Sequence, residues 1–245
     1  MLSHKNKVIF IHVRKAGGTS IQSLFPDATQ KFMEGVLSPE WVDSNKFYSE
    51  YFKFTVVRNP WDRFISGWRY CFSTQNLTIH EVLENLPEMD LCKNITAAGV
   101  PERVRKIYLD AYLNEAIYLK QREWRIENKL PVTRHPRLVG HDYRHLTRNQ
   151  TASFVYNDGR VVVDAVINME DLRNGLLRFS DRLGIDPNAL PHRNKNRDSR
   201  LDDYRNIFDK RARELFEKVY EKDVAMLGYD FDAGPGVAPK NKIKL

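Results

Sequence analysis

The sequence predicts an α/β fold of three layers, in which a central, mostly parallel sheet is flanked by helices. Three apolar runs rich in β-branched or aromatic residues predict buried strands at Val8 to Val13, Phe52 to Val57 and Val161 to Ile167. Each run is followed by a segment in which apolar residues recur at helical spacing. Strands that alternate with helices in this way are typical of a parallel sheet covered by its connecting helices.

The helices after the first two strands have recognisable ends. The first carries apolar residues at helical spacing up to Phe25 and is expected to stop at Pro26, which cannot continue a helix. The second has Asn59 as its capping residue, Pro60 at the first helical position and Asp62 in the first turn. All three features favour a helix that begins directly after its strand.

Further helices are expected in the rest of the chain. After the third strand, apolar residues form one stripe from Leu172 to Leu183, and Gly184 is expected to end that helix. Two more helices are expected around Glu102 to Arg125 and Arg205 to Leu227. The second of these supplies a C-terminal helical region.

The chain contains no internal repeat and no Gly/Ser-rich linker, so we expect a single domain over residues 1–231 and a flexible basic tail over 232–245. Its 245 residues suffice for a substantial core without disulfides. It lacks both a secretory signal pattern and an apolar run of about 18 residues, so we expect a cytoplasmic protein without a membrane span. Cys71 and Cys92 lack the partners of a zinc site, and no metal is expected.

The turn after the first strand, Arg14 to Ser20, has the composition of an anion site. Its two glycines allow the backbone to approach an anion closely, and the N–H groups at the helix start point toward it. Two hydroxyls and the charge of Lys15 add to these donors, which suits a phosphate or sulfate group. The alternative is an ordinary glycine turn capped by Thr19. The turn is not a Walker A loop, because there the lysine directly precedes the hydroxyl residue.

A second candidate site follows the next strand. Arg58 ends that strand, at the same carboxyl edge of the predicted sheet as Lys15, where open α/β sheets bind ligands. Ser66 lies two turns into the following helix. An arginine fork with a hydroxyl suits a phosphate monoester. The alternative is that Arg58 forms a structural ion pair, for example with Asp62. Together the two turns predict a ligand with two separate anionic groups.

Two segments resemble the motifs of carbohydrate sulfotransferases of the membrane-type family 2 group, which use 3′-phosphoadenosine 5′-phosphosulfate (PAPS). "IHVRKAGGTS" resembles the first motif, I-H-x-P-K-x-G-G-T-S, with Arg14 in place of the proline. "VRNPWDRFIS" resembles the second motif, V-R-N-P-x-x-R-x-x-S. Weaker similarity includes "HLTRNQ", "VVVDAVINMEDL" and "YEKDVAMLGYDF", so the resemblance extends from about residue 8 to about residue 231.

This resemblance implies a P-loop-like fold and transfer of the sulfuryl group from PAPS to a hydroxyl of an acceptor, with a saccharide favoured. It implies that Lys15 and the turn bind the 5′-phosphosulfate, and that Arg58 and Ser66 bind the 3′-phosphate. The basic loop "PHRNKNRDSR" would cover the nucleotide or contact an anionic acceptor, or else form a solvated surface. The candidate donor-binding residues are Arg14, Lys15, Ala16, Gly17, Gly18, Thr19, Ser20, Arg58, Ser66, Arg193 and Arg197.

The acceptor hydroxyl also needs a general base. Family members use a histidine or a carboxylate after the first motif, and residues 26–50 contain no histidine. Glu34 is our choice there, since its apolar neighbours Phe32 and Met33 would help raise its pKa by desolvation. His145 and His141 are the rival candidates, although a histidine in a basic loop is commonly a surface residue.

Two other classes of protein remain as alternatives. In a P-loop kinase or NTPase, "VVVD" would be a strand that ends in Asp164 and holds Mg²⁺. A nucleic-acid-binding protein would explain the net charge of +7, but the basic loop has no aromatic residue to stack on bases. The acceptor's identity and the oligomeric state stay open.

Overall fold

The computed structural model describes residues 1–28, 49–70, 78–84, 127, 145–146, 149–155, 159–186, 189–190 and 203–239. The chain divides into two compact units. The first comprises Met1–Arg63, Asn149–Ile207 and Tyr220–Leu245, and the second comprises Phe64–Arg148 and Phe208–Val219. The single domain expected over residues 1–231 stays a prediction, as does the flexible tail.

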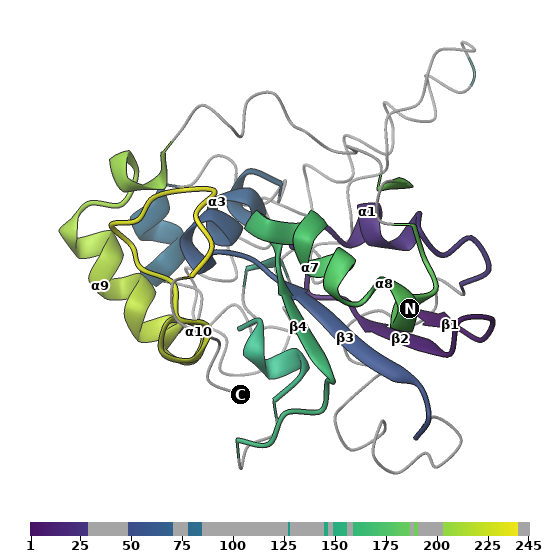
Figure 1. Ribbon diagram of the computed structural model, residues 1–245. Helices are drawn as coiled ribbons and strands as arrows, with labels where there is room; N and C mark the ends of the chain where they lie inside the picture. Colours follow the sequence, from purple (N-terminus) through teal and green to yellow (C-terminus); the bar gives the residue numbers. More distant parts are fainter. Residues whose placement is uncertain are drawn as a thin grey trace, which may run out of the picture. The chain divides into compact units, whose positions relative to one another are not determined.

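The first unit is built on a sheet of four strands in the order β1-β2-β3-β4 among the residues that the structure describes (Figure 1). β2 (Val8–Ile11), β3 (Phe52–Val57) and β4 (Ala165–Asn168) are parallel neighbours. The short β1 (Leu2–Ser3) pairs antiparallel with β2 and was not predicted. A mostly parallel sheet flanked by helices is the predicted fold class, which is therefore confirmed.

The structure corrects the bounds of two predicted strands. The first strand ends at Ile11, two residues before the predicted end. The third was predicted to start at Val161, but β4 begins at Ala165, because Val161 instead forms an isolated antiparallel bridge with Val155. The second strand has the predicted bounds. All three parallel strands therefore exist, and only their ends differ.

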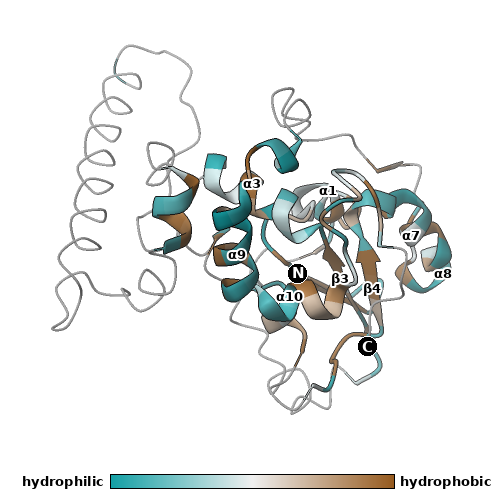
Figure 2. Cartoon of the chain, turned by 90° about the vertical axis from the view of Figure 1, so that its left-hand side faces the viewer, coloured by the Kyte–Doolittle hydropathy of each residue, from teal (hydrophilic) through white to brown (hydrophobic). Residues whose placement is uncertain are grey.

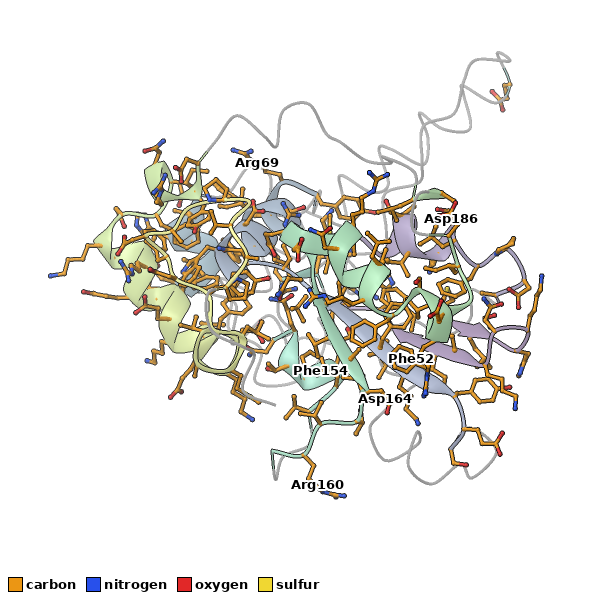
Figure 3. All side chains as sticks on the ribbon, viewed as in Figure 1. Phe52, Arg69, Phe154, Arg160, Asp164 and Asp186 are labelled. Atoms are coloured by element: carbon orange, nitrogen blue, oxygen red, sulfur yellow. The ribbon has the colours of Figure 1, made fainter. Side chains whose placement is uncertain are left out.

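Asp164 fixes the start of β4. Its carboxylate accepts a hydrogen bond from the Lys53 N–H at 2.7 Å, and its own N–H donates to the Lys53 carbonyl at 2.7 Å. Figure 3 shows Asp164 beside Phe52, the first residue of β3, at the same end of the sheet. Asp164 therefore precedes β4 and lies at the amino end of the parallel strands.

The helices of the structure are mostly shorter than predicted. The first is α1 (Gly18–Gln22), which ends before Phe25, and the second is α3 (Pro60–Tyr70), which begins at the predicted residue. The α-helices that follow are α7 (Leu172–Arg178), α8 (Ser180–Leu183), α9 (Lys210–Val219) and α10 (Glu221–Leu227). Three 3₁₀ helices are η3 (Thr151–Ser153), η4 (Met169–Asp171) and η7 (Tyr204–Asn206). The helix predicted around Glu102 to Arg125 lies outside the described residues.

Two long helices of the prediction are interrupted in the structure. The helix predicted from Leu172 to Leu183 divides at Phe179, whose ring packs 5.6 Å from that of Phe52. The helix predicted around Arg205 to Leu227 is interrupted at residues 207–209, between η7 and α9, and again at Tyr220, which is 1% exposed. Gly184 ends α8 in the left-handed conformation, as predicted.

The core of the first unit lies between the sheet and its helices. Phe10 and Phe54, on neighbouring strands, are fully buried with ring centroids 5.0 Å apart. α7 lies close against β4 at Gly175. A Cβ atom at this position would be only 2.4 Å from a methyl group of Ile167. Figure 2 shows hydrophobic colouring on β3 and β4 and hydrophilic colouring on much of α7 and α8. This contrast is typical of a buried sheet with amphipathic helices on it.

The second unit has its own apolar cluster. The rings of Phe64, Phe208 and Phe216 lie 5.3 to 5.8 Å apart in edge-to-face arrangements. Helical residues 79–84 are joined to α9 and its start by a hydrogen bond between His80 and Asp209 and by an ion pair between Glu84 and Arg211. None of the helices that the structure describes is long and apolar enough to cross a membrane.

Candidate active site

The turn predicted to bind an anion lies between the carboxyl end of β2 and α1. Lys15 and Gly17 both have left-handed backbones, with φ of 66° and 76°. The Gly17 carbonyl accepts the first hydrogen bonds of the helix, from Ser20 at 3.0 Å and Ile21 at 3.2 Å. In the described part of the chain, the N–H groups of residues 17–19 donate to no protein acceptor. These three donors are therefore available to a bound anion.

Both glycines of the turn are closely covered by side chains. A Cβ on Gly17 would lie 2.6 Å from the sulfur of Met169, and a Cβ on Gly18 would lie 2.0 Å from Nε2 of His12. The His12 ring is also stacked on Phe10, with centroids 5.7 Å apart. The turn therefore needs glycine for a second reason besides anion approach, namely the close packing of two neighbouring side chains.

Substitution of Gly18 with alanine is expected to lower the free energy of unfolding by about 1–3 kcal/mol, the usual cost of overpacking. The added methyl group would overlap the His12 ring, which must then move away from Phe10. Urea denaturation of Gly18→Ala measures this cost. In a His12→Ala background the same substitution should cost much less. An equal cost in both backgrounds would contradict the assignment to His12.

The other residues of the turn differ in exposure. Arg14, which replaces the proline of the motif, is buried with 5% of its surface exposed, and Ser20 is 8% exposed. Lys15 and Thr19 are partly exposed, while Ala16 is fully buried. Lys15 and the Thr19 hydroxyl are thus the side chains of this turn that reach solvent most readily.

Arg58 joins the second candidate site to the first. Its Nη1 donates to the main-chain carbonyl of Lys15 at 3.2 Å. Its Nε and Nη2 bind one carboxylate oxygen of Asp62 at 2.8 and 2.7 Å. The ion pair considered as an alternative is therefore present. A guanidinium group has more N–H donors than these contacts use, so an anion could still bind Arg58.

The backbone of Arg58 is held by Gln150. The side-chain amide of Gln150 accepts from the Arg58 N–H at 2.9 Å and donates to the Arg58 carbonyl at 2.8 Å. Gln150 is itself fixed by Asp223 of α10, whose carboxylate accepts from the N–H groups of Gln150 and Thr151 and from the Thr151 hydroxyl. Burial raises the pKa of Asp223, while the nearby charge of Arg63 opposes that rise.

A second group of side chains holds the residue after Arg58. Glu170 accepts from the Asn59 N–H at 2.8 Å and from the Tyr229 hydroxyl at 2.6 Å. The Asn59 amide donates to the Tyr204 hydroxyl at 3.1 Å, and its oxygen caps α3. Burial raises the pKa of Glu170, and it raises that of Tyr204 to about 12. The second motif is thus fixed at two successive residues.

The remaining predicted site residues are not all described. Ser66 is partly buried on α3, in the part of that helix that belongs to the second unit. His145, a candidate base, is also in the second unit, is 4% exposed, and has its ring 4.8 Å from that of Tyr70. The candidates outside the described residues are Glu34, His141, Arg193 and Arg197.

Sequence reasoning gave no role to the residues that hold the second motif. Gln150 and the segments that contain Glu170, Asp223 and Tyr229 were noted only as weak family similarity. Nothing in their local patterns indicates that they meet Arg58 and Asn59. A polar residue within an apolar stripe, as Asp223 is within α10, is the one local signal for a buried partner.

The position of Asp164 contradicts the kinase interpretation of "VVVD". That interpretation needs Asp164 at the carboxyl end of a strand, next to the anion-binding turn. Asp164 instead precedes β4 and binds the backbone of Lys53. Among the residues described, no group of histidine, cysteine, aspartate and glutamate side chains could hold a metal ion.

The mostly parallel sheet, with a lysine-containing glycine turn and an arginine at its carboxyl edge, defines an α/β protein with basic residues at the edge where open sheets of this class commonly bind ligands. A sequence model of the Sulfotransferase family matches residues 1–230. The chain therefore belongs to the sulfotransferase family, and sulfuryl transfer is its general activity. Comparison with curated proteins and with solved structures gave no match.

Proposed function

We propose that this sulfotransferase takes the sulfuryl group from PAPS and transfers it to a hydroxyl group of a carbohydrate. The observation that carries the proposal is the hydrogen bond from Arg58 to the Lys15 carbonyl. This bond brings the two basic turns together, and PAPS has a phosphosulfate and a separate 3′-phosphate to match them. The carbohydrate acceptor is supported by the motif resemblance alone.

The residues of the first unit fit such a donor. The N–H groups of residues 17–19, which have no acceptor among the described residues, suit the oxygens of the phosphosulfate, and the left-handed turn lets the backbone approach them. The partly exposed Lys15 supplies a charge next to these groups. Arg58 retains N–H donors for the 3′-phosphate, and Asp62 and Gln150 orient it. Ser66 is proposed as a second ligand of the 3′-phosphate.

The reaction forms a bond from the acceptor oxygen to sulfur and breaks the bond from sulfur to the bridging oxygen of the 5′-phosphate. The acceptor proton passes to a base, and adenosine 3′,5′-bisphosphate leaves. Negative charge develops on the bridging oxygen, as in phosphoryl transfer. We assign Lys15 to stabilise that oxygen, and the turn N–H groups to hold the oxygens on sulfur. Glu34 and His145 remain the proposed candidates for the base.

A thermal-shift experiment tests the donor. At about 100 times its Kd, adenosine 3′,5′-bisphosphate should stabilise the protein by roughly 2.7 kcal/mol without added metal. Adenosine 5′-monophosphate, which lacks the 3′-phosphate that Arg58 would bind, should give a smaller shift at the same concentration. ATP with Mg²⁺ is tested alongside it, because a nucleotide kinase would be stabilised more by that ligand. No shift with the bisphosphate, or a larger one with ATP and Mg²⁺, would contradict PAPS as donor.

A further inference from the structure

We propose that Arg58 is also a positioning residue for Lys15, so that the residue assigned to the 3′-phosphate sets the place of the amine assigned to the leaving oxygen. This inference rests on the proposed function and adds a role to one of its residues. In this role Arg58 acts through the main-chain carbonyl of Lys15. The two basic turns would then work as one coupled unit.

The first observation is the backbone of Lys15. Its φ of 66° is in the left-handed region, which is unfavourable for a residue with a Cβ atom. Lys7 is the other non-glycine residue with positive φ in the described part of the chain. Such a conformation persists where surrounding contacts hold it, and these positions are frequent in functional sites. The Lys15 backbone therefore needs a partner that fixes it.

Arg58 is one such partner. Its Nη1 donates to the Lys15 carbonyl at 3.2 Å, so it fixes the peptide unit that follows the lysine. Because φ and ψ of Lys15 orient its Cα–Cβ bond relative to the turn, a shift of this carbonyl changes the direction in which the side chain leaves the backbone. A misplacement of about 1 Å in an active site can lower a rate by about 10²-fold.

Arg58 is rigid enough to act in this way. Asp62 binds its Nε and Nη2, and Gln150 binds both its N–H and its carbonyl. Its side chain is 16% exposed, and that of Asp62 is 19% exposed. The guanidinium group is thus held by Asp62 of the helix and by the Lys15 carbonyl of the turn, and the Arg58 backbone is held by Gln150. Asp62 is not assigned a direct contact with the donor, so its contribution would be to hold Arg58.

The first experiment compares turnover with donor affinity in Arg58→Lys. Lysine keeps the positive charge, but it cannot bind Asp62 and the Lys15 carbonyl in the same geometry. We expect kcat to fall by roughly 10-fold or more, in addition to a higher Kd for adenosine 3′,5′-bisphosphate. Asp62→Asn should also lower kcat, because it weakens the hold on Arg58. The matched controls are Arg213→Lys and Glu217→Gln, which alter an ion pair of the same spacing on α9.

The second experiment repeats Arg58→Lys in a Lys15→Ala background. If Arg58 acts through Lys15, its effect on kcat should largely disappear once the amine is absent, while its effect on the bisphosphate Kd remains. If Arg58 has only a structural role, or a role in binding alone, Arg58→Lys should lower kcat by the same factor in both backgrounds. Urea midpoints of all variants show whether each is folded. If Arg58→Lys does not fold, Asp62→Asn takes its place in the comparison of the two backgrounds.

The outcomes separate this inference from the function on which it rests. Transfer from PAPS by the wild type, with kcat effects of Arg58→Lys that vanish in the Lys15→Ala background, supports the coupling. Transfer by the wild type with equal effects in both backgrounds overturns the coupling and leaves the proposed function intact. No bisphosphate binding and no transfer by the wild type overturns both.

Discussion

Substitution of Lys15 with alanine is expected to lower turnover by roughly 10²- to 10³-fold, the order found when one donor to a developing oxyanion is removed. Lys15 lies in the same turn as the N–H groups of residues 17–19, which donate to no acceptor in the described part of the chain, and it is joined to Arg58 through its carbonyl. Its amine is assigned to the leaving oxygen, where charge appears only as the bond to sulfur breaks. The loss should therefore appear in kcat more than in the Kd of the bisphosphate.

The chain offers a close control for this substitution. Lys7 also has a left-handed backbone, with φ of 49°, and it precedes β2 whereas Lys15 follows it. Lys7→Ala therefore removes a lysine side chain from a similar conformation at the other end of the same strand. We expect Lys7→Ala to leave kcat unchanged. If Lys15→Ala behaves like Lys7→Ala in a steady-state transfer assay, Lys15 has no part in the chemistry.

The fold class could be predicted because its signals are local. The apolar run Phe52 to Val57 contains the whole of β3, and the Asn59-Pro60 pair marks the start of α3. The ends of the other strands depend on contacts between distant residues. Asp164 starts β4 through Lys53, which is 111 residues away in the chain. The break at Phe179 likewise coincides with its packing against Phe52, a contact that helical periodicity does not reveal.

In the candidate site, too, some features follow from local sequence and others depend on residues that are distant in the chain. The glycine turn and Arg58 could be identified because each forms a compact pattern within a few residues. The side chains that orient them could not, since Gln150 lies 92 residues from Arg58, and Glu170 lies 111 residues from Asn59. The sequence suggested that Arg58 either forms an ion pair or binds a ligand. In the structure, Arg58 forms the ion pair with Asp62 and also binds the carbonyl of Lys15.

The prediction with the largest effect on stability concerns Asp223, which lies 73 residues from Gln150 in the chain. Its carboxylate is fully buried and accepts three hydrogen bonds, at 2.8 to 3.0 Å, from Gln150 and Thr151. The buried Arg63 lies near enough for its charge to lower the pKa of Asp223. Asp223→Ala would leave these donors without their acceptor and would remove a buried negative charge from the neighbourhood of Arg63. We expect a loss of about 3–5 kcal/mol in the free energy of unfolding.

Urea denaturation followed by circular dichroism measures this loss, and Asp209→Ala is the matched control. Asp209 also accepts a backbone hydrogen bond, from Ala212 at 2.8 Å, and also faces a basic side chain, that of His80. Its side chain is 60% exposed, so water can replace the lost contacts, and its removal should cost much less. Equal losses in the two variants would show that burial does not determine how much Asp223 contributes to the free energy of unfolding. Because Asp223 fixes Gln150, and Gln150 holds both backbone groups of Arg58, any folded Asp223 variant should also bind the bisphosphate more weakly.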